Sequence, residues 1–327
     1  MGCCASMGDV NDTVFLGSSV CVVGNINRDI KTSPLMAHAR LFEDGETSAA
    51  SIVETVGGGA ANSAAAAAAL GAKVAFLGRV GADGLGDRLE RTLTNWGIEA
   101  HLARDPERPS GTSIALTWEK GTRHFISCLP ASQALRDSDL DLSKVGELRH
   151  LLRADVWFAD AMLFGGNKQL FQQARSMGFA VSLDLNWDPC WHVAGAETVL
   201  ARKQAVRATL PWVTLAHGNR RELMEFADAP DLDTALRRIT GWGARAIVVH
   251  LGSDGAGYFC DGEWTIEPPV LAQSPLHATG TGDVLSVCMI LMHHATDRPV
   301  RQRLRWANTV VAEFMEGKRH LIPALAS

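Results

Sequence analysis

The chain has 327 residues, a formal net charge of −5 and 46% hydrophobic residues, which is typical of a soluble globular protein. The small negative charge, the lack of a basic stripe and the lack of any run of about 18 apolar residues argue against a nucleic-acid partner and against a membrane span. Seven scattered cysteines without a C-x-x-C pair, and histidines without ligand spacing, favour reduced thiols, a cytoplasmic location and no structural metal site.

The N-terminal stretch "MGCCAS" matches the myristoylation pattern M-G-x-x-x-[ST], and Cys3 and Cys4 are available for palmitoylation. The alternative is an upstream start codon or a cloning tail, with Met7 as the working start, and this reading is favoured because short motifs recur by chance. We therefore expect a disordered tail over 1–17 and one domain over 18–327.

Short apolar runs alternate with helical patterns along most of the chain. The runs contain many β-branched residues, as buried strands do, and the segments between them carry apolar residues at helical spacing. This order predicts a doubly wound, mostly parallel sheet with helices on both faces. The expected strands are 20–26, 73–80, 156–163, 180–186, 212–218 and 246–252, and the expected helices are 87–97, 167–178, 197–210, 220–227 and 233–243.

Two regions interrupt this alternation. Residues 31–55 carry no helical pattern, and 111–128 reads as a β-hairpin that turns at 119–121. We expect these segments, about 31–55 and 106–128, to form a small β-sheet that acts as a lid over one edge of the main domain. The free strand edges of such a lid could pair with a second copy of the chain and form a homodimer.

Polar residues follow the first strand, in "GNINRD". Asn27 and Asp29 could bind sugar hydroxyls at the carboxyl edge of the sheet, or they could cap backbone groups in a turn. The glycines at 57–59 precede Asn62 and an alanine-rich helix that can pack closely on a sheet. This stretch lacks both the dinucleotide-binding and the P-loop spacings.

Three further stretches carry candidate chemistry. In "HGNRREL", Asn219 and Glu222 share one side of a first helical turn, so they could hold Mg²⁺ through water or form a capping box. "VVHLGSDGAGYF" is a strand that runs into a glycine turn, as would border a nucleotide. In "ATGTGDVL", Gly280, Thr281 and Gly282 predict a turn before a buried helix, and Asp283 falls in its first turn, where an anion can bind beside a base.

Together these stretches resemble the ribokinase-like, or phosphofructokinase-B, carbohydrate kinases. The resemblance runs from about residue 18 to residue 325, and its two specific signatures are "GGGAANSAAAAAALG…VGADGLGD" and "ATGTGDVL". It implies that Asp283 is the base that takes the proton of a sugar hydroxymethyl group. The backbone amides of the turn and of Asp283 would form an anion hole for the transferred phosphoryl group.

The resemblance also assigns the remaining sites. Glu222 and Asn219 would organise Mg²⁺ and phosphate through water. The other matched positions are Asn27, Asp29, Gly58 and Asn62 for the sugar, and Gly252, Ser253, Gly255 and Asn308 for ATP.

Several residues depart from the family pattern. His277 replaces an aspartate beside the anion hole, so a monovalent-cation site is left open, and His250 replaces a threonine. Asp254 stands where Lys or Arg is common. Asp188 occupies the place of an arginine in a D-x-N-x-R segment, which favours a neutral sugar over an acidic one.

The sequence therefore predicts an ATP- and Mg²⁺-dependent kinase that phosphorylates a primary hydroxyl of a small sugar. A nucleoside kinase of the same fold, and a sugar-binding regulator without turnover, are the alternatives.

Overall fold

The computed structural model describes residues 18–36, 43–119, 123–274, 279–294, 297–322 and 324–326. The expected N-terminal tail, its acylation pattern and His277 lie outside the described residues. Within the described part of the chain, no helix is both long and apolar enough to cross a bilayer.

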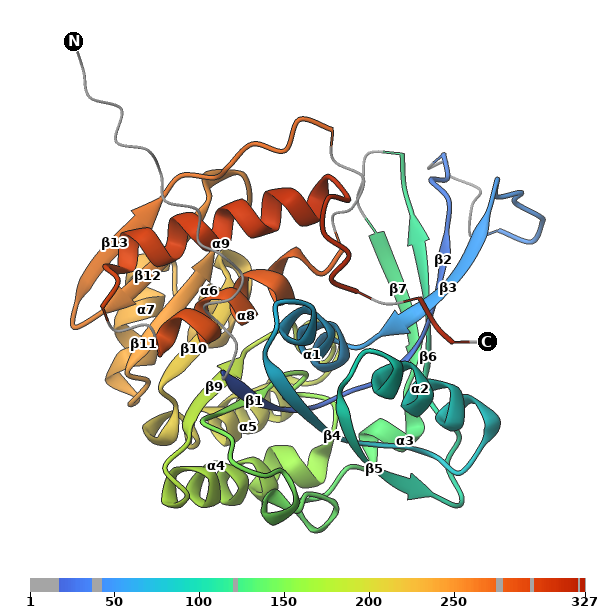
Figure 1. Ribbon diagram of the computed structural model, residues 1–327, viewed down its shortest axis with the longest axis horizontal. Helices are drawn as coiled ribbons and strands as arrows, with labels where there is room; N and C mark the ends of the chain where they lie inside the picture. The colour runs from blue at the N-terminus through green and yellow to red at the C-terminus, as the bar shows by residue number, and fades with distance from the viewer. Residues whose placement is uncertain are drawn as a thin grey trace.

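A nine-stranded sheet forms the centre, in the order β13-β12-β11-β10-β9-β8-β1-β4-β5 (Figure 1). All neighbours from β11 to β5 are parallel, and β12 and β13 extend the sheet as antiparallel strands. The predicted doubly wound, mostly parallel sheet is confirmed. Its strands are β1 (Ser19–Val23), β4 (Lys73–Gly81), β5 (Glu99–Asp105), β8 (His150–Arg153), β9 (Ala180–Asp184), β10 (Leu215–Asn219), β11 (Ala246–His250), β12 (Ala256–Cys260) and β13 (Glu263–Glu267).

Helices cover both faces of the sheet, because successive side chains of a strand point to opposite sides. On β1, Val20 and Val22 join one hydrophobic core, whereas Cys21 and Val23 join the other. The first core includes side chains of α1 (Gly59–Ala69), α2 (Gly84–Asn95), α8 (Thr281–His293) and α9 (Val300–Met315). The second includes side chains of α4 (Asn167–Ser176), α5 (Ala196–Arg207), α6 (Arg220–Ala227) and α7 (Leu232–Gly241).

A separate four-stranded sheet, which we call the lid, has the order β3-β2-β6-β7 and stands beside the main sheet (Figure 1). Its strands are β2 (Asn27–Thr32), β3 (Ile52–Gly57), β6 (Thr112–Thr117) and β7 (Arg123–Cys128). β6 and β7 form the predicted antiparallel hairpin, while β2 pairs with β6 in parallel. A short helix, α3 (Pro130–Gln133), follows β7.

The strand predicted at 156–163 is wrong. The strand of this βαβ unit is β8, which ends at Arg153, and the apolar run after it forms a loop and a single π-helical turn, Met162–Gly166. Trp157 and Leu163 are nevertheless buried in the second core. An apolar run reports burial, and burial alone does not distinguish a strand from a packed loop.

Candidate active site

The candidate site is built around the start of α8. Gly280 is the N-cap, with φ +83°, and a Cβ at this position would lie 2.4 Å from Ile322 Cδ1, so the turn requires glycine. The first intrahelical hydrogen bond runs from Val284 N to Gly280 O at 2.9 Å. The backbone N–H groups of the first turn, Thr281 to Asp283, precede that bond at the positive end of the helix, as the sequence predicts.

Asp283 lies in this first turn and contacts α1. Its Oδ2 accepts a hydrogen bond of 3.1 Å from Asn62 Nδ2. Burial raises the pKa of Asp283 to about 8, and the charges of Asp155, Glu222 and Asp29 add to the rise, while the Asn62 hydrogen bond opposes it. A carboxyl group with this pKa can exchange a proton near neutral pH, as a general base must.

Asp155 is a site residue that the sequence reasoning missed. It follows β8 in the left-handed conformation, with φ +55°, and its carboxylate accepts backbone N–H bonds from Asn25, Gly59 and Ala60 at 3.0–3.3 Å. A Cβ on Gly59 would lie 3.0 Å from Asp155 Oδ1 and 3.4 Å from Asp283 Oδ1, so both carboxylates face this glycine. An aspartate directly after a strand is a signal for a site residue. The sequence analysis missed it because it placed this strand at 156–163, after Asp155, whereas β8 ends at Arg153.

Asp184 and Glu222 complete a group of acidic side chains. Burial raises the pKa of Asp184 well above its usual value, and Glu222, Asp283 and Asp155 raise it further. Burial also raises the pKa of Glu222. Such like-charged carboxyl groups repel one another when ionised, so the arrangement favours a bound cation or hydroxyl donors between them.

Asn219 and Glu222 form the capping box that the sequence left open. Glu222 N donates to Asn219 Oδ1 at 2.9 Å, and Asn219 N donates to Glu222 Oε2 at 2.8 Å. Because these bonds use the amide oxygen and one carboxylate oxygen, little remains for direct metal ligation. Among the described residues no group of three His, Cys, Asp or Glu side chains could hold a metal ion directly. The donor set fits Mg²⁺ that keeps most of its own water.

The residues expected at the sugar lie on β2 and at the start of α1. Asn27 and Asp29 belong to the lid strand rather than to a turn, and Asn27 Nδ2 donates to Asp29 Oδ1 at 2.8 Å. Gly58 is the N-cap of α1 with φ +98°, and a Cβ there would lie 2.3 Å from Asn25 O. Asn62 Oδ1 is buried and has no hydrogen-bond partner among the described residues. It is therefore an acceptor available to a ligand hydroxyl.

Comparison with known proteins decides the family. The profile of the pfkB family carbohydrate kinases matches residues 18–313. The chain belongs to this family. It is therefore a carbohydrate kinase, a phosphotransferase with an alcohol group as acceptor.

Named relatives and solved structures agree with this assignment. The chain is 25% identical to a fructokinase from Vibrio alginolyticus over 270 residues, which cover 80% of this chain and 85% of that protein. It is 26% identical to a ribokinase from Arabidopsis thaliana over 283 residues, 81% of this chain and 68% of the relative. The fold matches a putative ribokinase II from E. coli with a TM-score of 0.77 at 18% identity, covering 94% of this chain and 96% of the other.

The positions expected at ATP lie in the turn after β11 and on α9. Gly252 and Ser253 lie in an exposed turn after β11, and Gly255, with φ +97°, would place a Cβ 2.2 Å from Glu267 O. Asn308 on α9 uses its amide nitrogen internally, since Nδ2 donates to the carbonyl oxygens of Glu267 and Pro268 at 3.2 and 2.8 Å. Both donor hydrogens of Asn308 thus hold the chain after β13.

His250, at the end of β11, lies directly under the turn of α8. Its Nε2 is 3.1 Å from Ser286 Oγ, and a Cβ on Gly282 would lie 3.1 Å from its Nδ1. Burial lowers the pKa of His250 to about 4, so the ring is neutral at physiological pH. The imidazole therefore supports the turn by packing and one hydrogen bond rather than by charge.

Asp188, which stands in the place of the arginine of the family pattern, forms a buried ion pair. Its carboxylate is fully buried and makes two hydrogen bonds with Arg202, Nε to Oδ2 at 2.8 Å and Nη2 to Oδ1 at 3.1 Å. The side chain is thus a structural ion-pair partner in the second core and not a free acidic group at the sugar.

Proposed function

We propose that this protein transfers the γ-phosphate of ATP to a primary hydroxyl of a small neutral sugar, with Asp283 as the base. The observation that carries the proposal is the pairing of Asp283 with Asn62 at the start of α8, beside the backbone amides of the turn. This place combines a base, Asp283, with backbone N–H groups that can donate to an anion and with an acceptor for a hydroxyl, Asn62 Oδ1. Phosphoryl transfer requires positioning and charge stabilisation of this kind.

In the proposed reaction the sugar hydroxyl gives its proton to the Asp283 carboxylate. The hydroxyl oxygen forms a bond to the γ-phosphorus while the bond from that phosphorus to the bridging oxygen breaks, and ADP leaves with the electron pair. The backbone N–H groups of Gly280, Thr281, Gly282 and Asp283 would donate to the phosphoryl oxygens during transfer.

Asn27, Asp29, Gly58 and Asn62 are proposed to hold the sugar. Asn62 Oδ1 lacks a partner among the described residues, and Asp29 and Asp155 supply further acceptors nearby. A neutral sugar is favoured because an anionic one would meet the carboxylates of Asp283, Asp155 and Asp184. This argument adds to the one from Asp188, which stands in the place of an arginine and is itself paired with Arg202.

ATP and Mg²⁺ are the proposed cosubstrate and cofactor. A solved structure of a fructokinase from Xylella fastidiosa, similar in fold with a TM-score of 0.76 and 18% identity, contains ATP. Here Gly252, Ser253 and Gly255 would border the nucleotide, with Asn308 behind them. When bound, Mg²⁺ would neutralise phosphate charge, and Asn219 and Glu222 would orient its water ligands. A monovalent cation stays an open part of the proposal.

The lid is proposed to exclude water from the transfer and to pair with a second copy of the chain. Large apolar side chains are exposed on three of its strands. They are Ile52, Val53, Ile114, Phe125 and Ile126. Exposed apolar surface of this kind is typical of a protein interface. We therefore propose a homodimer that forms through the lid. The proposed location of the protein is the cytoplasm.

A screen for ADP release over neutral sugars, sugar acids and nucleosides tests the function directly. We expect turnover with a neutral sugar that has a free hydroxymethyl group and with Mg²⁺ present. Turnover with nucleosides alone would show that the protein is a nucleoside kinase and would contradict the proposal. A sugar that raises the melting temperature without ADP production, at any Mg²⁺ or K⁺ concentration, would indicate a regulator that has lost catalysis.

A further inference from the structure

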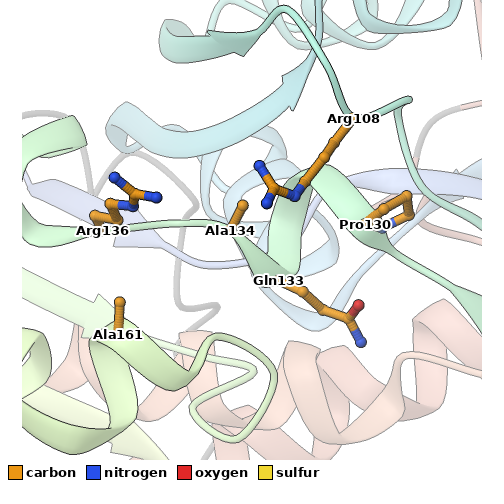
Figure 2. A pocket seen from close by; sticks show the side chains of 6 residues that line it. All are labelled: Arg108, Pro130, Gln133, Ala134, Arg136 and Ala161. Carbon is orange, nitrogen blue, oxygen red and sulfur yellow. The ribbon is translucent and has the colours of Figure 1, made fainter.

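A surface pocket lies at the base of the lid. It has a volume of about 290 Å³ and is lined by Arg108, Pro130, Gln133, Ala134, Arg136 and Ala161. The two arginines lie on either side of Ala134, and Ala161 approaches from a different segment of the chain (Figure 2). The lining therefore combines two guanidinium groups and one amide with small apolar side chains, and it contains no carboxylate.

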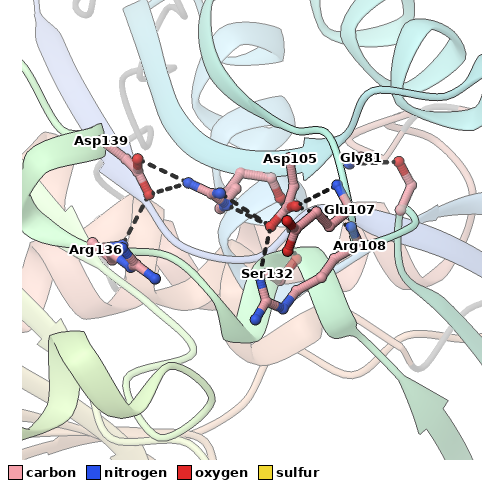
Figure 3. Close-up of polar contacts among 9 residues, drawn as sticks. Gly81, Asp105, Glu107, Arg108, Ser132, Arg136 and Asp139 are labelled. Carbon is pink, nitrogen blue, oxygen red and sulfur yellow. Dashed lines mark hydrogen bonds and ion pairs between the residues drawn. The ribbon is translucent and has the colours of Figure 1, made fainter.

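The positive charge in this pocket is incompletely neutralised. Arg136 uses its backbone N–H to bond Asp139 Oδ2 at 3.0 Å, but its guanidinium has no carboxylate within ion-pair distance among the described residues (Figure 3). Arg108 Nη1 is 3.4 Å from Asp105 Oδ2. The same oxygen already accepts two hydrogen bonds from Arg79, at 3.1 and 3.0 Å. Arg108 shares its carboxylate with Arg79, and Arg136 has no carboxylate partner among the described residues, so both pocket arginines can bind an anion.

The size and chemistry of the pocket select a class of ligand. A volume of about 290 Å³ lies just below the usual range of roughly 300–1,000 Å³ for small-molecule sites, so the pocket suits a small ligand. Guanidinium groups bind phosphate oxygens through two parallel N–H bonds. We propose that this pocket binds the phosphate group of a small phosphorylated metabolite, at a site separate from the sugar and nucleotide sites.

The pocket is connected to the lid by the chain segments that line it. Arg108 precedes β6 by four residues, and Pro130 follows β7 by two, so the two ends of the lid hairpin form part of the wall. Ala131 N donates to Pro109 O at 3.3 Å, which joins these two ends.

Gly111, three residues after Arg108, packs closely against Leu129 and Asn27. A Cβ on this residue would lie 2.7 Å from Leu129 Cδ2 and 3.2 Å from Asn27 Cβ. An anion held by both arginines would brace the base of the lid and restrict its movement.

Binding of glycerol 3-phosphate, measured by isothermal titration calorimetry with glycerol as the unphosphorylated comparison, tests the site. We expect wild-type protein to bind glycerol 3-phosphate and not glycerol. Arg136→Gln and Arg108→Gln should each weaken binding about ten-fold or more, because each removes a charge-assisted hydrogen-bond pair. Arg237→Gln is the matched control, since it removes the same charge from an exposed pair with Asp233 on α7 and should leave the affinity unchanged.

Hydrogen exchange gives a second readout that does not depend on the kinase reaction. With glycerol 3-phosphate bound, amides of β6 and β7 should exchange more slowly in wild type and not in Arg136→Gln. Equal affinity of wild type and both pocket variants would assign the anion to another place, such as the start of α8, and would overturn the proposal. Absence of binding to wild type would overturn it as well. Neither result bears on Asp283 as the base.

Discussion

Asn62 donates a 3.1 Å hydrogen bond to Asp283 across 221 residues of chain, and so joins the start of α1 to the start of α8. The bond stabilises the ionised form of a carboxyl group whose pKa burial raises to about 8. The other polar atom of Asn62, Oδ1, stays without a partner among the described residues. One amide can thus tune the proposed base and accept a hydrogen bond from another hydroxyl of the bound sugar.

Asp283→Asn should lower kcat by at least ~10²-fold, the usual scale for a positioned general base. Asparagine keeps the size of the side chain and cannot take the proton. Steady-state ADP release with the best sugar substrate measures the effect. A variant with wild-type kcat would exclude Asp283 as the base.

The pH dependence of the melting temperature tests whether Asp283→Asn keeps the fold. The pKa of Asp283 is raised from 3.8 to about 8, so its contribution to stability is present at low pH and is lost as pH rises through 8. Asp283→Asn removes this loss. We expect the melting temperature of the variant relative to wild type to be a few degrees higher at pH 9 than at pH 4.

Asn62→Ala should raise the KM for the sugar about ten-fold or more, because a hydroxyl of the bound sugar would lose its buried partner. It should also raise the pKa of Asp283, since the lost hydrogen bond favours the ionised form. The neighbouring Ser63→Ala, which keeps the helix and lies outside the proposed site, is the control. An unchanged KM in Asn62→Ala would remove this residue from the sugar pocket.

The rate should depend on pH through Asp283. Because the free protein holds this carboxyl group with a pKa of about 8, kcat/KM should rise nearly ten-fold per pH unit from pH 6 and level off near pH 8. Bound Mg²⁺ should move the midpoint to lower pH by favouring the carboxylate. A profile that is flat from pH 6 to pH 8 at low Mg²⁺ would contradict the assignment.

Acid should destabilise the protein through His293, the last residue of α8. Burial, together with the charges of His294, Arg303 and Arg245, lowers the pKa of His293 to about 4. The stability that depends on its neutral form is present above about pH 6.5 and is lost towards pH 4, where the unfolded chain binds more protons.

Urea unfolding over this pH range measures the histidine effect. We expect His293→Gln to reduce the slope by up to about 1.4 kcal/mol per pH unit, the value for one proton. Identical slopes for wild type and His293→Gln would contradict the prediction.

The exposed apolar side chains of the lid should mediate self-association. Phe125 and Ile126 on β7 are 44% and 53% exposed. Replacing both by glutamate should convert a dimer to a monomer, as measured by light scattering after size-exclusion chromatography. Val193→Glu alters a residue that is 83% exposed outside the lid and should leave the mass unchanged. A wild-type monomer at all concentrations would refute the interface.

The sequence predicted most helices and strands because their signals are local. The capping box of Asn219 and Glu222 and the glycine N-cap of α8 depend on residues within one or two turns of each other. The errors came from signals that are not local. The strand at 156–163 was misplaced because its apolar residues fill the core from a loop, and the true strand, β8, carries the buried polar residues His150 and Arg153.

By itself the sequence determined the sheet and lid, the family signatures and the identity of Asp283 as the candidate base, since each rests on residue type and short spacing. Only the tertiary structure showed that Asp155 and Asp184 lie near Asp283 and that Asp188 forms an ion pair with Arg202. It also showed that two arginines line one pocket at the base of the lid. The reason is physical. Burial and neighbouring charge set the pKa and the free hydrogen-bonding capacity of a side chain, and both arise from segments that folding brings together over long stretches of chain.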